Sequence, residues 1–119
     1  MNLIVQPRHI KLALAGREEN WPLAAYEIKE LRAALANVAR TRPRFRDQPV
    51  GEMTENVLGA AFRSIDEAIR EKNSKKFVEA SGAVTEGCNS CHAALNHAFV
   101  VIRIPEQTSF PNQDFRLPK

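Results

Sequence analysis

The residues with the clearest capacity for chemistry are Cys88, Cys91 and His92, within the sequence Cys-Asn-Ser-Cys-His. On a helix, positions i, i+3 and i+4 share one face, so the two thiols and the imidazole point to the same side. This C-x-x-C-H spacing is typical of covalent haem attachment. The thiols meet the vinyl groups along one porphyrin edge, and the imidazole rises beneath the iron as an axial ligand. The sequence therefore predicts one covalent haem c, tethered by Cys88 and Cys91 and ligated by His92.

Two other chemistries use the same residue types. A redox dithiol usually opens a helix after a strand, and no strand is expected before Cys88. A zinc site needs a fourth ligand, for which only His9 and His97 remain as obvious candidates. Because the motif uses both cysteines of the chain, haem attachment is the interpretation that we favour.

Helical periodicity supplies the elements that must position this motif. Gly16 is placed to stop a short first helix, Asn20 to cap the second, and the pair Asn73-Ser74 to turn into the fourth. Residues 44–51, which include Pro49, are expected to form a loop. The predicted helices cover about residues 7–15, 21–40, 52–72 and 74–99.

Four helices with short connections predict an all-α, antiparallel four-helix bundle. Its first helix is short, and residues 100–119 form an extended tail packed on the domain. The 119 residues fit one domain, with 44% hydrophobic and 26% charged residues. No apolar run approaches the roughly 18 residues of a membrane span. Because no acid–base or nucleophile cluster stands out, an enzyme is not expected.

A C-x-x-C-H motif in the last helix of an all-helical domain resembles the class II c-type cytochromes, also called the cytochrome c prime group. The residues that carry the resemblance are Gly87 to His92 and the helical pattern over residues 7–99. It implies a monohaem electron-transfer protein or, as the alternative, a protein that binds or senses NO or CO at an open iron site. A homodimer is also in keeping with it, since such bundle cytochromes often pair through helix faces.

The N-terminal region carries a second resemblance. Residues 6–12, Ala15-Gly16 and residues 20–27 are similar to bacterial cytochrome-like proteins of no settled function, whose motif also lies late in the chain. This sequence departs from the cytochrome c prime pattern in its short first helix and its roughly 20 residues after the last helix. Covalent haem implies maturation in the periplasm. No leader with a basic and then an apolar region opens the chain, so we expect a mature or truncated chain that lacks its signal peptide.

The bundle order brings residues 1–12 close to His92, so His9 and Met1 are the main candidates for the sixth iron ligand. A surface or propionate-contacting role for His9 is nearly as well supported. If residues 16–22 were only a kink in one long helix, His9 would lie at the wrong end. Met53 is a weaker candidate, and His97 is expected at the rim because it lies about 140° round the helix from His92.

Several other side chains are candidate contacts of the haem. Arg8 and Lys11 are possible propionate partners, with solvated surface charge as the alternative. Packing, in the core stripe of the second helix or at its border, is the expected role of Trp21 and Tyr26. Phe110 and Phe115 either fold over the porphyrin or pin the tail to the bundle.

Arginines alternate along the segment that joins the second and third predicted helices. The net charge of +3 is concentrated in the first 50 residues, and this segment lies at the predicted haem end. It is a candidate docking surface for an acidic redox partner or for anionic lipid headgroups, with a solvated loop as the alternative. Nucleic acid is not an expected partner, because no supporting motif accompanies the arginines. The residues are Arg40, Arg42, Arg44 and Arg46.

Overall fold

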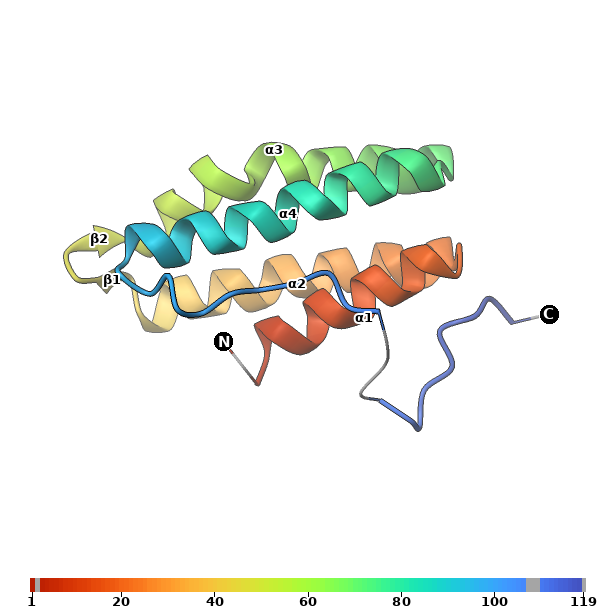
Figure 1. Cartoon of the computed structure of the whole chain (residues 1–119), viewed down its shortest axis with the longest axis horizontal. Coiled ribbons are helices and arrows are strands. Elements are labelled where there is room, and N and C mark those ends of the chain that lie inside the picture. Colours follow the sequence, from red (N-terminus) through yellow and green to blue (C-terminus); the bar gives the residue numbers. More distant parts are fainter. Residues whose placement is uncertain (2, 107–109, 119) are drawn as a thin grey trace.

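The computed structural model describes residues 1, 3–106 and 110–118, and this part of the chain is mostly helical. Two short strands form a hairpin between the second and third helices, so the expectation of an all-α fold holds apart from this hairpin. Figure 1 shows the arrangement of the elements. In chain order they are α1 (Val5–Arg17), α2 (Trp21–Thr41), β1 (Arg44–Phe45), β2 (Gln48–Pro49), α3 (Val50–Glu71) and α4 (Ser74–Ala94).

Two predicted helix caps are confirmed. The side chain of Asn20 accepts a hydrogen bond from the backbone N–H of Leu23 at 3.3 Å, at the start of α2. Asn73 does the same for Lys76 at 3.1 Å, at the start of α4. Each cap satisfies one of the backbone donors that a helix start leaves without a partner. Because Glu19 adopts a positive φ between them, α1 and α2 are two helices rather than one kinked helix.

The predicted loop over residues 44–51 was wrong in part. Phe45 pairs with Gln48 across an antiparallel hairpin, and α3 begins at Val50 rather than at Glu52. The two turn residues, Arg46 and Asp47, both have positive φ, as the tightest hairpin turns require. Such turns usually contain glycine or asparagine, so the sequence carried no signal for this one.

The fourth helix ends five residues earlier than predicted. Its last residue is Ala94 rather than Phe99, and Asn96 then takes the left-handed conformation with φ of 61°. The backbone N–H of His97 closes the helix end on the carbonyl of His92. Asparagine tolerates the left-handed region better than most residues, so Asn96 was the stop signal that the sequence offered.

The helices pack in chain order, α1 on α2, α2 on α3 and α3 on α4, with a weaker contact between α1 and α4. Trp21 is buried, as predicted, and meets the ring of Phe77 edge to face at 5.8 Å. Tyr26 lies at the border of the core and is half exposed. Gly16 lets α1 approach α4 closely, since a Cβ there would lie 1.9 Å from the Phe77 ring. The interior is lined by Leu12, Ile28, Leu31, Leu58, Phe62, Ile65 and Val84.

After α4 the chain turns back and runs between α4 and α1 (Figure 1). Ile104 and Pro105 line a small cavity with residues of both helices, among them His9. Further on, Phe115 is buried, and its carbonyl accepts a hydrogen bond from the Asn20 side chain at 3.1 Å. Residues 104–105 therefore lie along the contact between α1 and α4, whereas Phe115 is held at the start of α2.

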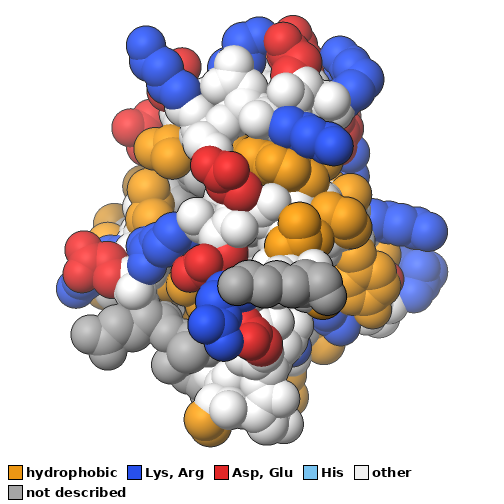
Figure 2. Space-filling model, turned by 90° about the vertical axis from the view of Figure 1, so that its right-hand side faces the viewer, with side chains coloured by type: hydrophobic (Ala, Val, Ile, Leu, Met, Phe, Trp, Pro, Cys, Tyr) orange, Lys and Arg blue, Asp and Glu red, His pale blue; other side chains and the backbone are white. Residues whose placement is uncertain are grey.

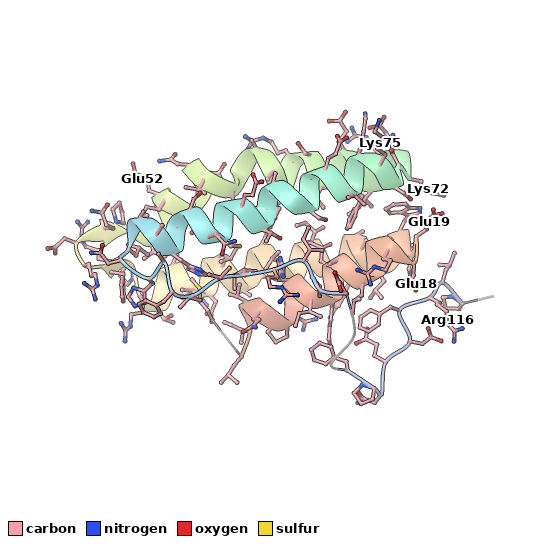
Figure 3. The ribbon with its side chains drawn as sticks, viewed as in Figure 1. Glu18, Glu19, Glu52, Lys72, Lys75 and Arg116 are labelled. Carbon is pink, nitrogen blue, oxygen red and sulfur yellow. The ribbon has the colours of Figure 1, made fainter. Side chains whose placement is uncertain are left out.

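The start of α1, the end of α2, the start of α3 and the end of α4 meet around one cavity, described below. The opposite end carries Glu18, Glu19, Lys72 and Lys75 (Figure 3). On that end acidic and basic side chains are interspersed (Figure 2). Within the described residues, no helix combines the length and the apolar character needed to cross a membrane.

Candidate haem-binding site

The last two turns of α4 bring the predicted haem residues to a single cavity. Cys88, Cys91 and His92 all line it, as their shared helix face predicts. Gly87 sits buried against α3, where a Cβ would lie 2.4 Å from the side chain of Leu58. This close approach holds the motif against α3. Both cysteines are free thiols rather than a disulfide.

The walls of the cavity are apolar and come from all four helices and from the tail. Burial raises the pKa of the Cys88 thiol to about 11 and also raises that of Cys91, with the nearby Cys91 adding to the effect at Cys88. Both thiols are therefore protonated at neutral pH and lie in an apolar environment. The apolar wall residues are Val5, Leu35, Val50, Leu58, Leu95, Val100 and Ile102.

The volume of the cavity is about 190 Å³. Pockets that enclose most of a small ligand measure roughly 300–1,000 Å³. Seating a porphyrin here therefore requires that the walls move apart or that one edge of the ring stays in solvent. The donor set fits a haem, because two thiols and one imidazole share a single helix face inside an apolar surround.

His92 has the hydrogen bond that haem-ligating histidines commonly have. Its Nδ1 lies 2.8 Å from the backbone carbonyl oxygen of Val100. A carbonyl can only accept, so Nδ1 carries the proton in this contact and Nε2 keeps its lone pair. Partners of this kind fix the orientation of a ligating histidine and raise its basicity.

His9 lies on the cavity wall, but its Nε2 is already engaged. This atom is 3.0 Å from the hydroxyl oxygen of Thr85, one turn before Cys88 on α4. Burial lowers the pKa of His9 from its ordinary value, which favours the neutral ring. The contact confirms that the start of α1 lies beside the end of α4, and it ties His9 to the helix that carries the motif.

Two methionines share the cavity with the motif. Met1 and Met53 both line it, one before α1 and the other in the first turn of α3. Thioether sulfur is a known axial ligand of haem iron. The sequence predicted that both methionines lie at the end of the fold that carries the motif, and the structure agrees.

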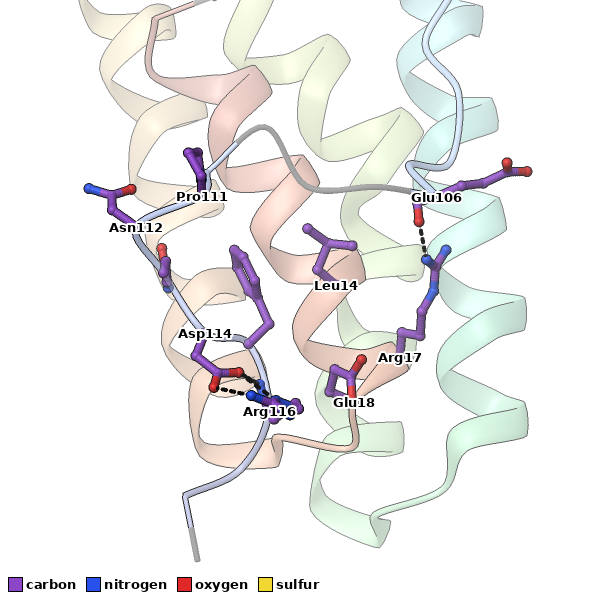
Figure 4. Close-up of a pocket in the computed structure, with 10 residues that line it drawn as sticks. Leu14, Arg17, Glu18, Glu106, Pro111, Asn112, Asp114 and Arg116 are labelled. Carbon is purple, nitrogen blue, oxygen red and sulfur yellow. Dashed lines mark hydrogen bonds and ion pairs between the residues drawn. The ribbon is translucent and has the colours of Figure 1, made fainter.

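The structure places the two predicted propionate partners away from the cavity. Arg8 donates from Nη1 to both carboxylate oxygens of the buried Glu27 on α2, at 2.6 and 3.2 Å. The ammonium of Lys11 lies over the ring of Phe110, 4.5 Å from its centroid. Neither residue is among those that line the cavity. Phe115 lines a different cavity, together with Leu14 and Arg17 of α1. Figure 4 shows this cavity.

An aromatic ladder lies beyond the motif. The ring of His97 stands between those of Phe45 and Phe99, with centroid distances of 5.3 and 5.2 Å. The guanidinium of Arg46 lies over the ring of Phe45, with its carbon 5.7 Å from the ring centroid. His97 lies outside the cavity wall, as expected, but the reason differs, because α4 ends at Ala94 and His97 is no longer on the helix.

The arginine segment is exposed at the same end of the molecule. Arg40, Arg42 and Arg44 are all exposed, and Arg46 is exposed at the hairpin turn. The side chain of Phe99 beside them is 79% exposed. An arginine-rich and partly apolar surface therefore adjoins the end that carries the cavity, where the acidic side chains of Asp47 and Glu52 are also exposed (Figure 3).

Several residues of the site were not identified from the sequence. The backbone of residues 100–102 contacts the motif helix through the side chains of Asn89 and His92. Thr85 was not recognised as the partner of His9. The only available signal for Asn89 was its place inside the motif, where the spacing rule leaves the residue type open.

In the described part of the chain, no three side chains of His, Cys, Asp or Glu come together as a metal site would require. Comparisons with family models, with curated proteins and with solved structures found no match for this chain. The case for a function therefore depends on the chemistry of the residues themselves.

Proposed function

We propose that this protein is a monohaem c-type cytochrome that transfers electrons in the periplasm. Cys88 and Cys91 hold the haem and His92 ligates its iron. The observation that carries the proposal is the hydrogen bond from His92 Nδ1 to the carbonyl of Val100, because it leaves Nε2 for a metal while the two thiols share the cavity. We further propose that the four helices form an antiparallel bundle of the cytochrome c prime kind.

When bound, the haem supplies an iron that cycles between Fe(III) and Fe(II). The residues of this chain hold it in three ways. Cys88 and Cys91 tether one edge from consecutive turns of α4, and the apolar wall excludes water from the ring. The carbonyl of Val100 orients the His92 imidazole and increases its electron donation.

The test is expression of the full chain together with a periplasmic haem-attachment system. We expect a Soret band and a haem that remains on the polypeptide after denaturation. Cys88→Ser and Cys91→Ser should each remove one tether, and His92→Ala should abolish the low-spin spectrum. His97→Ala is the matched control, because His97 follows α4 closely in the chain but does not line the cavity. Matured protein without a Soret band would refute the proposal.

A second candidate function is the binding of NO or CO at an open sixth position. The observation in its favour is that His9, the main candidate for the sixth ligand, has its Nε2 bonded to Thr85. The rest of the wall is apolar apart from the thioethers of Met1 and Met53 and two polar side chains of α1 and α3. Addition of CO to the reduced protein separates the two functions. A low-spin spectrum that CO leaves unchanged supports electron transfer, and a high-spin spectrum that CO converts supports gas binding.

For the partner, we propose an acidic redox protein that docks on the arginine segment. Its exposed guanidinium groups, together with the exposed ring of Phe99, combine a cationic rim with an apolar contact. The rate of electron transfer to an acidic acceptor should fall steeply with ionic strength and on reversal of charge at Arg42 and Arg44. Charge reversal at Lys72 and Lys75, at the far end, is the control (Figure 3). Equal rates in both sets of variants would refute this docking surface.

A further inference from the structure

The segment after α4 is held at both ends across the contact between α1 and α4. Near its start, residues 100–102 contact the motif helix through Asn89 and His92. Near its far end, Arg17 donates hydrogen bonds to the carbonyls of Pro105 and Glu106, at 2.7 and 2.6 Å (Figure 4). We call residues 100–106 the strap.

Asn89 binds the strap with both atoms of its amide. Its Nδ2 donates to the carbonyl of Ile102 at 3.0 Å, and its Oδ1 accepts from the N–H of the same residue at 2.7 Å. The side-chain amide of Asn89 thus pairs with the N–H and the carbonyl of one extended residue, as the backbone of a neighbouring β-strand would. Asparagine is among the few side chains with a donor and an acceptor side by side.

The strap in turn binds the imidazole of the motif. Val100 lies two residues before Ile102, and its carbonyl oxygen is 2.8 Å from His92 Nδ1. Both Val100 and Ile102 also form part of the cavity wall. Asn89 and His92 are three positions apart, so they lie on neighbouring turns of α4 and contact the same stretch of strap.

These contacts form a closed loop that begins and ends on one helix. Asn89 fixes the backbone of Ile102, and because Val100 is only two residues away, its carbonyl is held in place as well. This carbonyl accepts the hydrogen bond that keeps the proton of His92 on Nδ1. A neutral imidazole has two tautomers, and the partner of one nitrogen decides which is present. The residue between the two cysteines thus acts on the histidine that follows them, through the tail of the chain.

We propose that Asn89 is a positioning residue that clamps the strap and thereby holds His92 with its proton on Nδ1 and its Nε2 free to bind iron. This inference rests on the proposed haem function for its purpose, but the clamp itself is a property of the polypeptide. It also assigns the strap a role in closing the cavity wall. Loss of the clamp changes both the histidine tautomer and the access of water to the cavity.

The test compares Asn89→Ala with Ser90→Ala. The two positions are adjacent in the motif, and Ser90 is exposed. Hydrogen exchange at the Ile102 amide is measured in the full chain as purified, with or without haem. The amide bonds to Asn89, so exchange should speed up at least about tenfold in Asn89→Ala, because this variant loses both hydrogen bonds that join Asn89 to Ile102. Ser90→Ala should leave it unchanged.

A second measurement reports the histidine directly. In the chain expressed without haem attachment and labelled with nitrogen-15 in histidine, the ring shifts of His92 should show the Nδ1–H tautomer. Asn89→Ala should shift it toward the Nε2–H form that free imidazole prefers, and Ser90→Ala should not. In the haem-loaded protein, the reduction potential should change in Asn89→Ala alone, because the carbonyl partner tunes the ligand.

Unchanged exchange at Ile102 in Asn89→Ala would overturn the clamp, whether or not haem is present. Faster exchange with an unchanged tautomer, or with a reduction potential equal to that of Ser90→Ala, would overturn its action on His92. Failure of the proposed function has a different signature, since a chain that never takes up haem would still show the exchange and tautomer changes.

Discussion

The ion pair between Arg8 and Glu27 joins the first two helices, and its removal has a calculable effect on stability. The carboxylate of Glu27 is 1% exposed, and the Arg8 guanidinium, 31% exposed, contacts both of its oxygens. Replacing Arg8 with alanine leaves this carboxylate buried without its counter-charge. Breaking a buried pair in this way costs about 3–5 kcal/mol. Because water reaches Arg8, we expect the lower end, about 3 kcal/mol.

A loss of this size is large for a chain of 119 residues. Domains have roughly 0.05–0.15 kcal/mol of stability per residue, which gives about 6–18 kcal/mol here. The melting temperature should fall by about 10–15 °C. The assay is urea unfolding at neutral pH followed by circular dichroism. Lys11→Ala is the matched control on the same helix, where one cation–π contact with Phe110 should account for less than about 1 kcal/mol.

A double variant identifies the cause of the loss. If Arg8→Ala is destabilising because it strands a buried charge, then adding Glu27→Gln removes that charge and should restore part of the stability. A double variant as unstable as Arg8→Ala alone would refute the reasoning, as would equal losses for Arg8→Ala and Lys11→Ala. Haem content and spectrum should be the same in Arg8→Ala and Lys11→Ala, because neither residue lines the cavity.

Four further predictions concern the glycines of α4, His9 and Cys88. Gly82→Ala should stabilise the chain by about 0.5–1 kcal/mol in urea unfolding, because alanine favours a helix and nothing lies within 4 Å of its new Cβ. Gly87→Ala should instead be destabilising by about 1–2 kcal/mol, since its Cβ meets Leu58 at 2.4 Å, and stabilisation by both substitutions would contradict this packing. Burial lowers the pKa of His9, so the unfolded chain takes up a proton that the folded chain does not. The free energy of unfolding should therefore be highest above the ordinary pKa of histidine and should fall as the pH drops below it. His9→Gln should flatten this pH dependence. Parallel pH profiles for the two proteins would contradict the prediction. Alkylation of Cys88 at pH 8 in the folded, haem-free chain should be about 100-fold slower than in the chain unfolded in urea, because burial raises the pKa of the thiol from 9.0 to about 11. Mass spectrometry of the labelled peptides measures both rates, and equal rates would contradict the prediction.

Much of the local structure follows from short-range patterns. The caps at Asn20 and Asn73 and the helical stripes were predictable because the interactions that start and carry a helix span only three or four residues. The hairpin at Phe45 and the early end of α4 were not, because neither turn has the glycine that usually marks a positive φ. Asn96, which ends the helix, is a weaker signal of the same kind.

The sequence by itself determined the chemistry: two thiols and an imidazole on one helix face, from the spacing of Cys88, Cys91 and His92. Only the tertiary structure decided what surrounds them. His9 bonds to Thr85, 76 positions away, and the strap returns to the motif to bind His92. Such contacts depend on how helices pack and where the tail is pinned, which no local periodicity encodes. The face of a helix is set by a few neighbouring residues, whereas the partner of a histidine is set by the whole fold.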